Sequence, residues 1–235
     1  MAYFTIHHVA EQLADSLPTE HPVEGRYPLH SAALSNYRTR MLRVLSENLV
    51  DVNILDGSRC TALGLAAEHG YIDMVRLLLA VEGIDVNKAG FSIFGHPQPS
   101  PIGAAVREGH YDVVAVLLED ERVDVNRMQS NQHGQATSIL TDAVIAGMQT
   151  YPDRGTDAFD IFKLLLSCER IDISQRYFNE HGTPWSSPFV QAVENGWLDV
   201  VDLFLKEPRF DLSKQYQGCS YLHPLCRASL TSPVV

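Results

Sequence analysis

The sequence predicts an all-α repeat solenoid, and two observations lead to this expectation. Segments of 27 residues at 61–87, 100–126 and 187–213 align with one another without a gap, and an earlier copy occupies 27–53. Each copy joins an alanine-rich helical segment to a second, strongly apolar one. One copy cannot bury its own apolar surface, whereas a stack of copies buries it between neighbours.

Two further copies are interrupted or incomplete. One begins as SILTDAVIAGM at residue 138, breaks, and resumes at 160–174, while SYLHPLCRA at 220–228 is a partial copy. We therefore expect about five repeats followed by a C-terminal half-repeat.

Residue types at fixed positions predict two helices in each copy. The first helix is followed by a residue that tolerates left-handed backbone and so ends a helix: Asn36, Gly70, Gly109, Gly147 and Gly196. An aspartate then falls in the first turn of the second helix, where the helix dipole favours a carboxylate: Asp73, Asp112, Asp160 and Asp199.

These copies resemble the ankyrin repeat. The family's T-P-L-H-x-A signature is nearest in YPLHSAA at 27–33 and weaker in TALGLAA, SPIGAAV and SPFVQAV. The resemblance covers residues 26–228 and implies stacked helix pairs joined by projecting fingers. It also gives the signature histidines, His30 and His223, a structural role.

A repeat stack needs caps at its ends. Residues 4–17 place apolar side chains at nearly helical spacing, which predicts an N-terminal capping helix. The expected organisation is a capping helix and linker at 1–25, the ankyrin repeat domain at 26–228 and a C-terminal tail at 229–235.

Three consecutive segments between repeats are long, and we expect them to form elongated hairpin fingers: 88–100, 127–138 and 175–187. Each has a histidine followed by Pro or Gly: His96, His133 and His181. Aromatic residues accompany them: Phe91, Phe94, Tyr177, Phe178 and Trp185. Loops on a rigid scaffold often carry binding residues, so these side chains are expected to line a groove. The alternative is that they pack against one another as a small separate core.

In the ankyrin family, the two positions before each helix-ending glycine face the groove. Here they hold Glu68 and His69, Arg107 and Glu108, Ile145 and Ala146, and Glu194 and Asn195. An apolar pair between polar pairs is the composition expected of a ligand-site floor. Arg59 stands where the family prefers glycine in a finger turn. The insertion at 148–157, with Pro152 and Gly155, predicts a solvent loop between the helices of the fourth copy.

Charge and composition exclude several classes of function. The formal net charge is -11 and the 18 Lys and Arg residues are scattered, which argues against nucleic-acid binding. No run of about 18 apolar residues predicts a membrane span, and the N-terminus does not read as a signal peptide. Four sparse cysteines suggest a reducing compartment, so a cytoplasmic location is expected, with the nucleus as an alternative.

The leading interpretation is a non-catalytic protein–protein interaction module, such as an adaptor, that acts as a monomer and binds a partner through the concave face and fingers. The excess of acidic over basic residues favours a partner with a basic surface. Neither a cofactor nor a metal is expected. The alternative is a small-molecule or catalytic pocket between fingers and inner helices, with these acid–base candidates: His96, His133, His181, Glu180 and Arg107. A third interpretation is self-association through the fingers.

Overall fold

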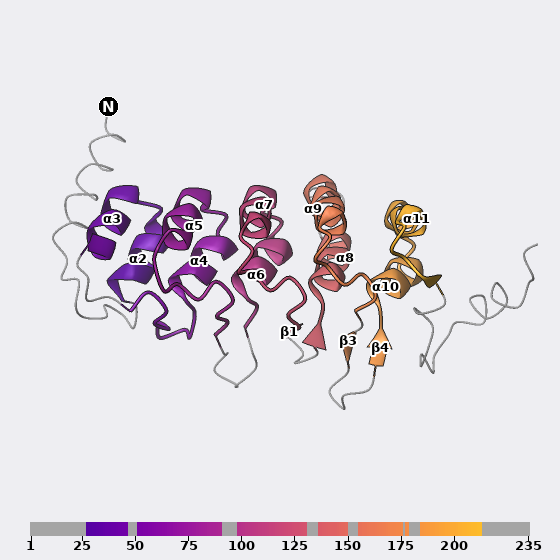
Figure 1. Cartoon of the computed structure of the whole chain (residues 1–235), viewed down its shortest axis with the longest axis horizontal. Helices are drawn as coiled ribbons and strands as arrows, with labels where there is room; N and C mark the ends of the chain where they lie inside the picture. Colours follow the sequence, from indigo (N-terminus) through magenta and orange to yellow (C-terminus); the bar gives the residue numbers. More distant parts are fainter. Residues whose placement is uncertain are drawn as a thin grey trace, which may run out of the picture.

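The computed structural model describes residues 27–46, 51–90, 98–130, 136–149, 155–175, 177–178 and 184–212. These residues form a row of five helix pairs (Figure 1). In each pair the first helix, here called inner, lies on the side of the row from which the fingers project, and the second, outer helix lies on the opposite side. One apolar core runs along the row between neighbouring pairs.

The first three pairs have similar lengths and the fourth is longer. The pairs are α2 (Pro28–Ser35) with α3 (Arg38–Ser46), α4 (Ala62–Glu68) with α5 (Ile72–Leu79), α6 (Pro101–Glu108) with α7 (Tyr111–Glu119), α8 (Ile139–Gln149) with α9 (Gly155–Ser167), and α10 (Pro188–Glu194) with α11 (Leu198–Lys206). Among the described helices, none is both long enough and apolar enough to cross a membrane.

Hydroxyl side chains fix where four of the five described inner helices begin, namely α4, α6, α8 and α10. Such an oxygen accepts a backbone N–H three residues on and so satisfies a donor that has no partner within the helix. These caps are Thr61 to Gly64 (3.0 Å), Ser100 to Gly103 (3.4 Å), Ser138 to Thr141 (3.2 Å) and Ser187 to Val190 (3.3 Å).

Left-handed residues end four of the inner helices, as the sequence predicts: Asn36 (φ 55°), Gly70 (71°), Gly109 (79°) and Gly196 (70°). The prediction for Gly147 is wrong, because this glycine lies inside α8. The insertion extends α8 to Gln149 and starts α9 at Gly155, so Asp160 is not in the first turn of its helix. Residues 148–149 and 155–157 of the expected solvent loop are therefore helical, and residues 150–154 lie outside the described residues.

A small antiparallel sheet adds to the helical architecture. Its strands are β1 (Gln129–Ser130), β2 (Ala136–Thr137), β3 (Tyr177–Phe178) and β4 (Pro184–Ser186), in the order β1-β2-β3-β4. Strands β1 and β2 form one hairpin, β3 and β4 form another, and Ala136 pairs with Phe178 between them. The hairpins project from the row beside the inner helices (Figure 1).

An asparagine ladder joins successive repeats. Asn87 donates to the Arg122 carbonyl at 2.7 Å and accepts from the Asp124 N–H at 2.8 Å. Asn53 and Asn126 make the corresponding pairs of bonds to the repeats that follow them. These bonds hold each finger base at a fixed distance from the next.

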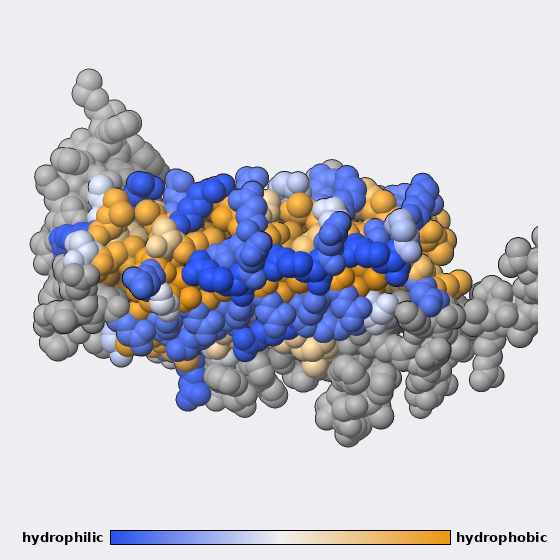
Figure 2. Space-filling view, viewed as in Figure 1, coloured by the Kyte–Doolittle hydropathy of each residue, from blue (hydrophilic) through white to orange (hydrophobic). Residues whose placement is uncertain are grey.

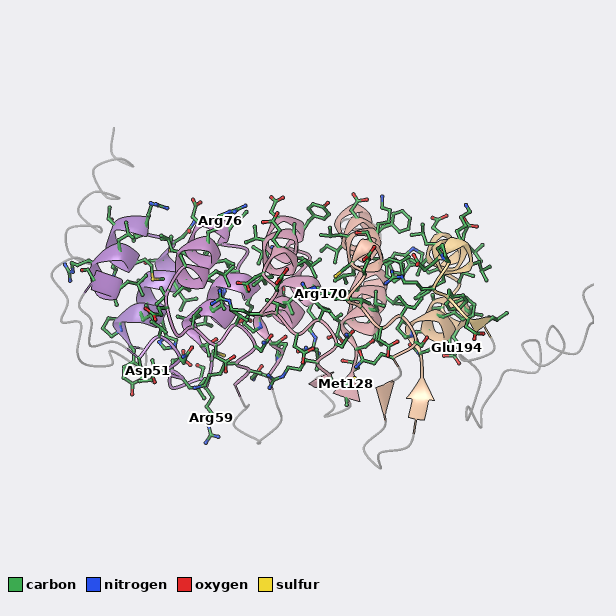
Figure 3. All side chains as sticks on the ribbon, viewed as in Figure 1. Asp51, Arg59, Arg76, Met128, Arg170 and Glu194 are labelled. Carbon is green, nitrogen blue, oxygen red and sulfur yellow. The ribbon has the colours of Figure 1, made fainter. Side chains whose placement is uncertain are left out.

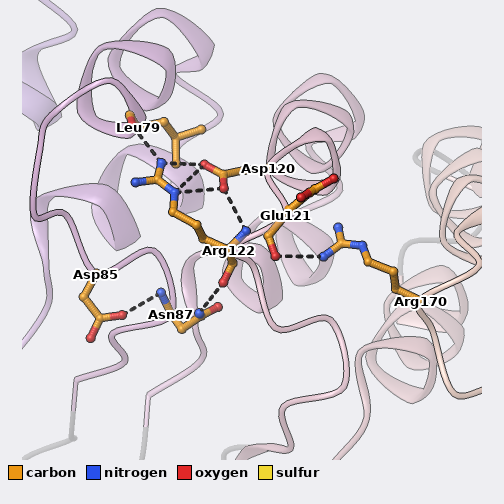
Figure 4. A network of polar contacts seen from close by, with 7 residues as sticks. All are labelled: Leu79, Asp85, Asn87, Asp120, Glu121, Arg122 and Arg170. Atoms are coloured by element: carbon orange, nitrogen blue, oxygen red, sulfur yellow. Dashed lines mark hydrogen bonds and ion pairs between the residues drawn. The ribbon is translucent and has the colours of Figure 1, made fainter.

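Arginines add a second set of bonds between repeats, on a face where a hydrophilic band runs along the row (Figure 2). Arg122 donates to the Leu79 carbonyl at 2.9 Å, at the end of α5 (Figure 4). Arg170, in the middle of this face in Figure 3, donates to the carbonyls of Leu118 (2.8 Å) and Val123 (2.9 Å). Arg209 likewise donates to the Leu166 carbonyl at the end of α9. Each guanidinium therefore satisfies carbonyls at a helix C-terminus, where cations are favoured.

Candidate functional site

The expected groove residues lie at equivalent ends of inner helices. Glu68 ends α4 and His69 caps it, Arg107 and Glu108 end α6, and Glu194 ends α10 with Asn195 as its cap. Ile145 and Ala146 instead lie within α8, because that helix continues to Gln149. The inner helices pack side by side along the row, so these ends form a series of neighbouring positions.

Arg107 is held by an acidic residue of the next repeat. Its Nε donates to Asp142 Oδ2 at 3.0 Å, and its Nη2 lies 2.9 Å from the same oxygen. Asp142 is buried and also accepts from the Thr137 hydroxyl at 2.7 Å. Burial raises the pKa of Asp142, while Arg107 and then Thr137 act in the opposite direction. The three side chains tie α6 to α8 and to strand β2.

This ion pair changes the charge of the face. Glu68 and Glu108 are exposed and make no ion pair with any described residue, whereas the charge of Arg107 is balanced by Asp142. The ends of α4 and α6 therefore carry net negative charge. The sequence analysis did not identify Asp142 as a site residue. The sequence does hold an aspartate at a position where two other copies have the apolar residues Leu65 and Ala104, and this difference indicates a polar contact.

The histidines near this edge bond to backbone. The Nδ1 of His69 lies 3.0 Å from the Leu65 carbonyl, and its ring lies 5.6 Å from that of Tyr71. The Nε2 of His110 lies 2.8 Å from the Glu68 carbonyl. His69 and His110 thus help to fix the turns that follow α4 and α6.

A shallow depression lies between the end of α4 and the segment 88–100. Its lining includes Thr61 and Glu68 from the second repeat, Lys88 and Gln98 from the finger, and Ala104 from α6. Its cavity volume is about 20 Å³, close to the room that one water molecule needs. Ligand pockets for small molecules typically measure about 300–1,000 Å³. The depression is therefore too small to enclose a small-molecule ligand.

Two of the long segments lie side by side at their bases. The pairing of β2 with β3 joins 127–138 to 175–187. Tyr177, Phe178 and Trp185 lie on strands β3 and β4. In the segment 88–100, the Gln98 N–H donates to the Gly90 carbonyl at 2.8 Å. The remaining expected finger residues lie outside the described residues: Phe91, Phe94, His96, His133, Glu180 and His181.

A family model describing ankyrin repeats in three copies matches residues 2–89. Residues 2–89 contain ankyrin repeats. No curated protein matches the chain. Ankyrin repeats generally mediate protein–protein interaction. The match extends across α2 to α5. The pairs α6–α7 and α10–α11 repeat the arrangement of inner helix, left-handed residue and outer helix, whereas among the described residues of α8 and α9 no left-handed residue separates the two helices.

The signature histidine of the first ankyrin copy is structural, as the resemblance implied. His30 is fully buried, and its Nε2 lies 3.1 Å from the Ile54 carbonyl and 3.0 Å from the Cys60 carbonyl. His223 lies outside the described residues. Within the described ranges, no three His, Cys, Asp or Glu side chains are grouped as metal ligands.

The first ankyrin finger contains a strained turn. Arg59 has φ 60°, in the left-handed region where the ankyrin pattern prefers glycine. The Asp56 carboxylate accepts the N–H groups of Ser58 and Cys60, each at 2.9 Å, and closes the turn. Gly90 lies so close to the Arg59 carbonyl that a β carbon at Gly90 would fall 1.5 Å from its oxygen. This turn holds Arg59 exposed and pointing away from the helix row (Figure 3).

Proposed function

We propose that this protein is a non-catalytic interaction module that binds a partner protein through the ends of its inner helices and its long fingers. The observation that carries the proposal is the series of exposed polar side chains at the ends of α4, α6 and α10. These side chains are spaced by the packing of rigid helices. A partner surface meeting them therefore encounters a preformed array and loses little free energy to ordering.

The charge of this array supports a partner with a basic surface. Glu68 and Glu108 are exposed, and the neighbouring cation, Arg107, is balanced by Asp142. Complementary charge of this kind raises association rates and excludes acidic competitors. The net charge of -11 also attracts a basic partner, and it does so over a longer distance.

The fingers support an extended contact rather than an enclosed pocket. Pairing between β2 and β3 joins the bases of two fingers into one sheet, which gives a partner a continuous backbone surface there. Tyr177 and Phe178 lie on β3 and Trp185 lies on β4, and aromatic residues are enriched among residues that dominate binding energy. No observation favours the catalytic alternative. Arg107 is bonded to Asp142, and the other acid–base candidates lie outside the described residues.

Affinity capture with charge-reversed variants tests the proposed acidic surface. The double variant Glu68→Lys, Glu108→Lys should lose the main partner recovered by the wild type, and recovery by the wild type should weaken as salt rises. The matched control is Glu82→Lys, Glu119→Lys, which reverses two exposed glutamates near the ends of the outer helices α5 and α7. Equal recovery by both double variants would reject the acidic surface.

A second pair of variants tests the fingers. The double variant Tyr177→Ala, Trp185→Ala should no longer bind the same partner. Its circular dichroism spectrum should match that of the wild type, and its thermal unfolding should remain cooperative. The exposed Tyr111→Ala in α7 serves as the aromatic control. If the finger variant recovers the same partners in the same amounts as the wild type, the fingers do not contribute to binding.

A further inference from the structure

A groove lies between the outer helices α7 and α9, on the side of the row opposite to the fingers (Figure 1). Its lining includes Asp112 from α7 and, from α9, Asp160, Lys163, Leu164 and Ser167. Its cavity volume is about 730 Å³, and it is open to solvent. The groove is therefore far larger than the depression beside α4, and it lies away from the inner-helix and finger surface.

One feature of the sequence accounts for part of this space. Ala115 lies one turn after Asp112 in α7, where the other outer helices have longer side chains: Leu42, Arg76, Lys163 and Asp202. Residues three apart share one face of a helix, so Ala115 and Asp112 lie on the same side of α7. The short side chain leaves room beside α9.

Acidic charge predominates in the groove. The Nζ of Lys163 lies 2.5 Å from Asp160 Oδ1 and 4.8 Å from the centroid of the Phe159 ring, so its charge is balanced within α9. Asp112 is exposed and makes no ion pair with any described residue. The Asp112 carboxylate is therefore available to a cation on a partner.

The walls of the groove favour a helix as its occupant. Both walls are helices, whose backbone groups bond internally, so the groove offers side chains rather than a strand edge. A helical occupant needs no backbone partner, because it too satisfies its own groups. The lining from Asp160 to Ser167 covers ~10 Å of α9, or about two turns. Leu164, which is half-buried between these two residues, provides an apolar contact.

We propose that the groove between α7 and α9 is a second docking surface, which binds a basic amphipathic helix of a partner protein. An arginine or lysine of that helix pairs with Asp112, and an apolar side chain one turn away packs on Leu164. Side chains three or four residues apart share a helix face, so one helix supplies both contacts. A second copy of this chain is disfavoured as the occupant, because two chains of net charge -11 repel each other.

The test measures binding of two synthetic helices to the full chain by fluorescence anisotropy. Each is a hydrocarbon-stapled peptide of about 15 residues, a length at which helices become stable. One peptide has an arginine with leucines at positions i−3 and i+4, and the other has glutamate in place of that arginine. Salt is held at about 0.15 M, so that attraction by distant charges is screened.

Two double variants separate the groove from the overall charge of the protein. Asp112→Asn, Asp160→Asn removes two carboxylates from the groove. Asp73→Asn, Asp199→Asn removes the equivalent exposed aspartates from the first turns of α5 and α11. Both variants lose the same total charge. A further pair acts on the space itself, because Ala115→Gln fills it with a neutral side chain and Ala115→Ser leaves it open.

We expect the arginine helix to bind the wild type and the glutamate helix not to bind. Asp112→Asn, Asp160→Asn should weaken binding about tenfold, because Lys163 then has no counter-charge and repels the arginine. Ala115→Gln should weaken binding by a similar factor, whereas Ala115→Ser and Asp73→Asn, Asp199→Asn should change it less than about twofold.

The finger variant separates this proposal from the proposed function. Tyr177→Ala, Trp185→Ala should bind the arginine helix as tightly as the wild type does, because the fingers lie on the other side of the row (Figure 1). Failure of the finger surface therefore leaves the groove unaffected.

Three results would overturn the proposal. In the first, the arginine helix does not bind the wild type, so the groove does not accept a helix of this chemistry. In the second, the two double variants weaken binding equally, so net charge alone attracts the helix. In the third, the wild type sediments as a dimer that Ala115→Gln converts to a monomer, so a second copy of the chain is the occupant.

Discussion

Gly147 in α8 lies directly against the indole ring of Trp197, which precedes α11. A β carbon placed on Gly147 would fall 2.0 Å from Cη2 and 2.5 Å from Cζ3 of that ring. The same relation occurs between Gly70 and His110, where a β carbon would fall 2.6 Å from Nδ1. At both places, a ring at the start of one outer helix packs on a glycine of the preceding repeat.

Gly147→Ala should therefore destabilise the protein by about 2 kcal/mol. The added methyl group overlaps the ring, and overpacking in a rigid interface typically costs 1–3 kcal/mol. Elsewhere in a helix the same change is favourable, because alanine is the better helix former by about 1 kcal/mol. Urea unfolding of the wild type and the variant measures the difference.

A double-mutant cycle gives the control. In a Trp197→Ala background, Gly147→Ala should be neutral or stabilising, because the methyl group then has space. An unchanged penalty in that background would mean that Trp197 is not its cause.

The regular parts of the fold follow from the sequence because they repeat. Aligned copies predict the helix pairs, and Gly70, Gly109 and Gly196 adopt the predicted left-handed backbone. The prediction fails for Gly147 because α8 continues past this residue into the insertion. Gly147 instead provides space for the ring of Trp197 from the next repeat. Such a contact depends on packing between repeats and has no local signature.

Other residues that organise the site also act between repeats. Asp142 is buried against Arg107, and the Asn87 side chain bonds to backbone 35 and 37 residues later. The sequence contains a signal for the arginines, which precede an apolar residue and an aspartate in three copies: Arg122, Arg170 and Arg209. The period alone does not predict which carbonyls they bind.

Arg170→Lys should destabilise the protein by about 1–2 kcal/mol. The Arg170 guanidinium bonds to carbonyls of Leu118 and Val123 from two nitrogens, and an ammonium on a flexible chain cannot reproduce that geometry. Chemical denaturation provides the measurement. Arg76→Lys, an exposed arginine on α5, is the matched control and should change stability by less than about 0.5 kcal/mol. Equal effects of the two variants would show that the carbonyl contacts contribute nothing measurable.

Arg59→Gly should increase stability by about 0.5–1 kcal/mol, because glycine adopts φ 60° without the clash that a β carbon makes. Arg59→Val should lower stability, since β-branched residues are the least tolerant of positive φ. Denaturant midpoints of the three proteins should rank in the order glycine, arginine, valine. A valine variant as stable as the wild type would contradict the strained turn.

The buried Asp142 predicts a specific dependence of stability on pH. Burial raises its folded-state pKa above the ordinary value of 3.8, so between these two values the folded protein binds the proton more often than the unfolded chain does. By linkage, the contribution of this group to stability is fully present below pH 3.8 and is lost as pH rises through the folded pKa. The difference in unfolding free energy between wild type and Asp142→Asn should therefore decrease as pH rises from below 3.8. Urea titrations at several pH values measure it, and an increase with pH would mean that the Arg107 ion pair outweighs burial.

The variant Thr137→Val gives a second test of how the surroundings of Asp142 set its pKa. The Thr137 hydroxyl donates to Asp142 Oδ1 at 2.7 Å and favours the ionised carboxylate. Removing that donor should raise the pKa of Asp142 further, so that the decrease in stability extends to higher pH than in the wild type. Ser138→Ala, next in the chain, removes a hydroxyl that bonds to Thr141 rather than to Asp142, so it should lower stability without moving the pH at which the decrease occurs. If both variants shift the pH profile equally, the hydrogen bond from Thr137 does not tune the carboxylate.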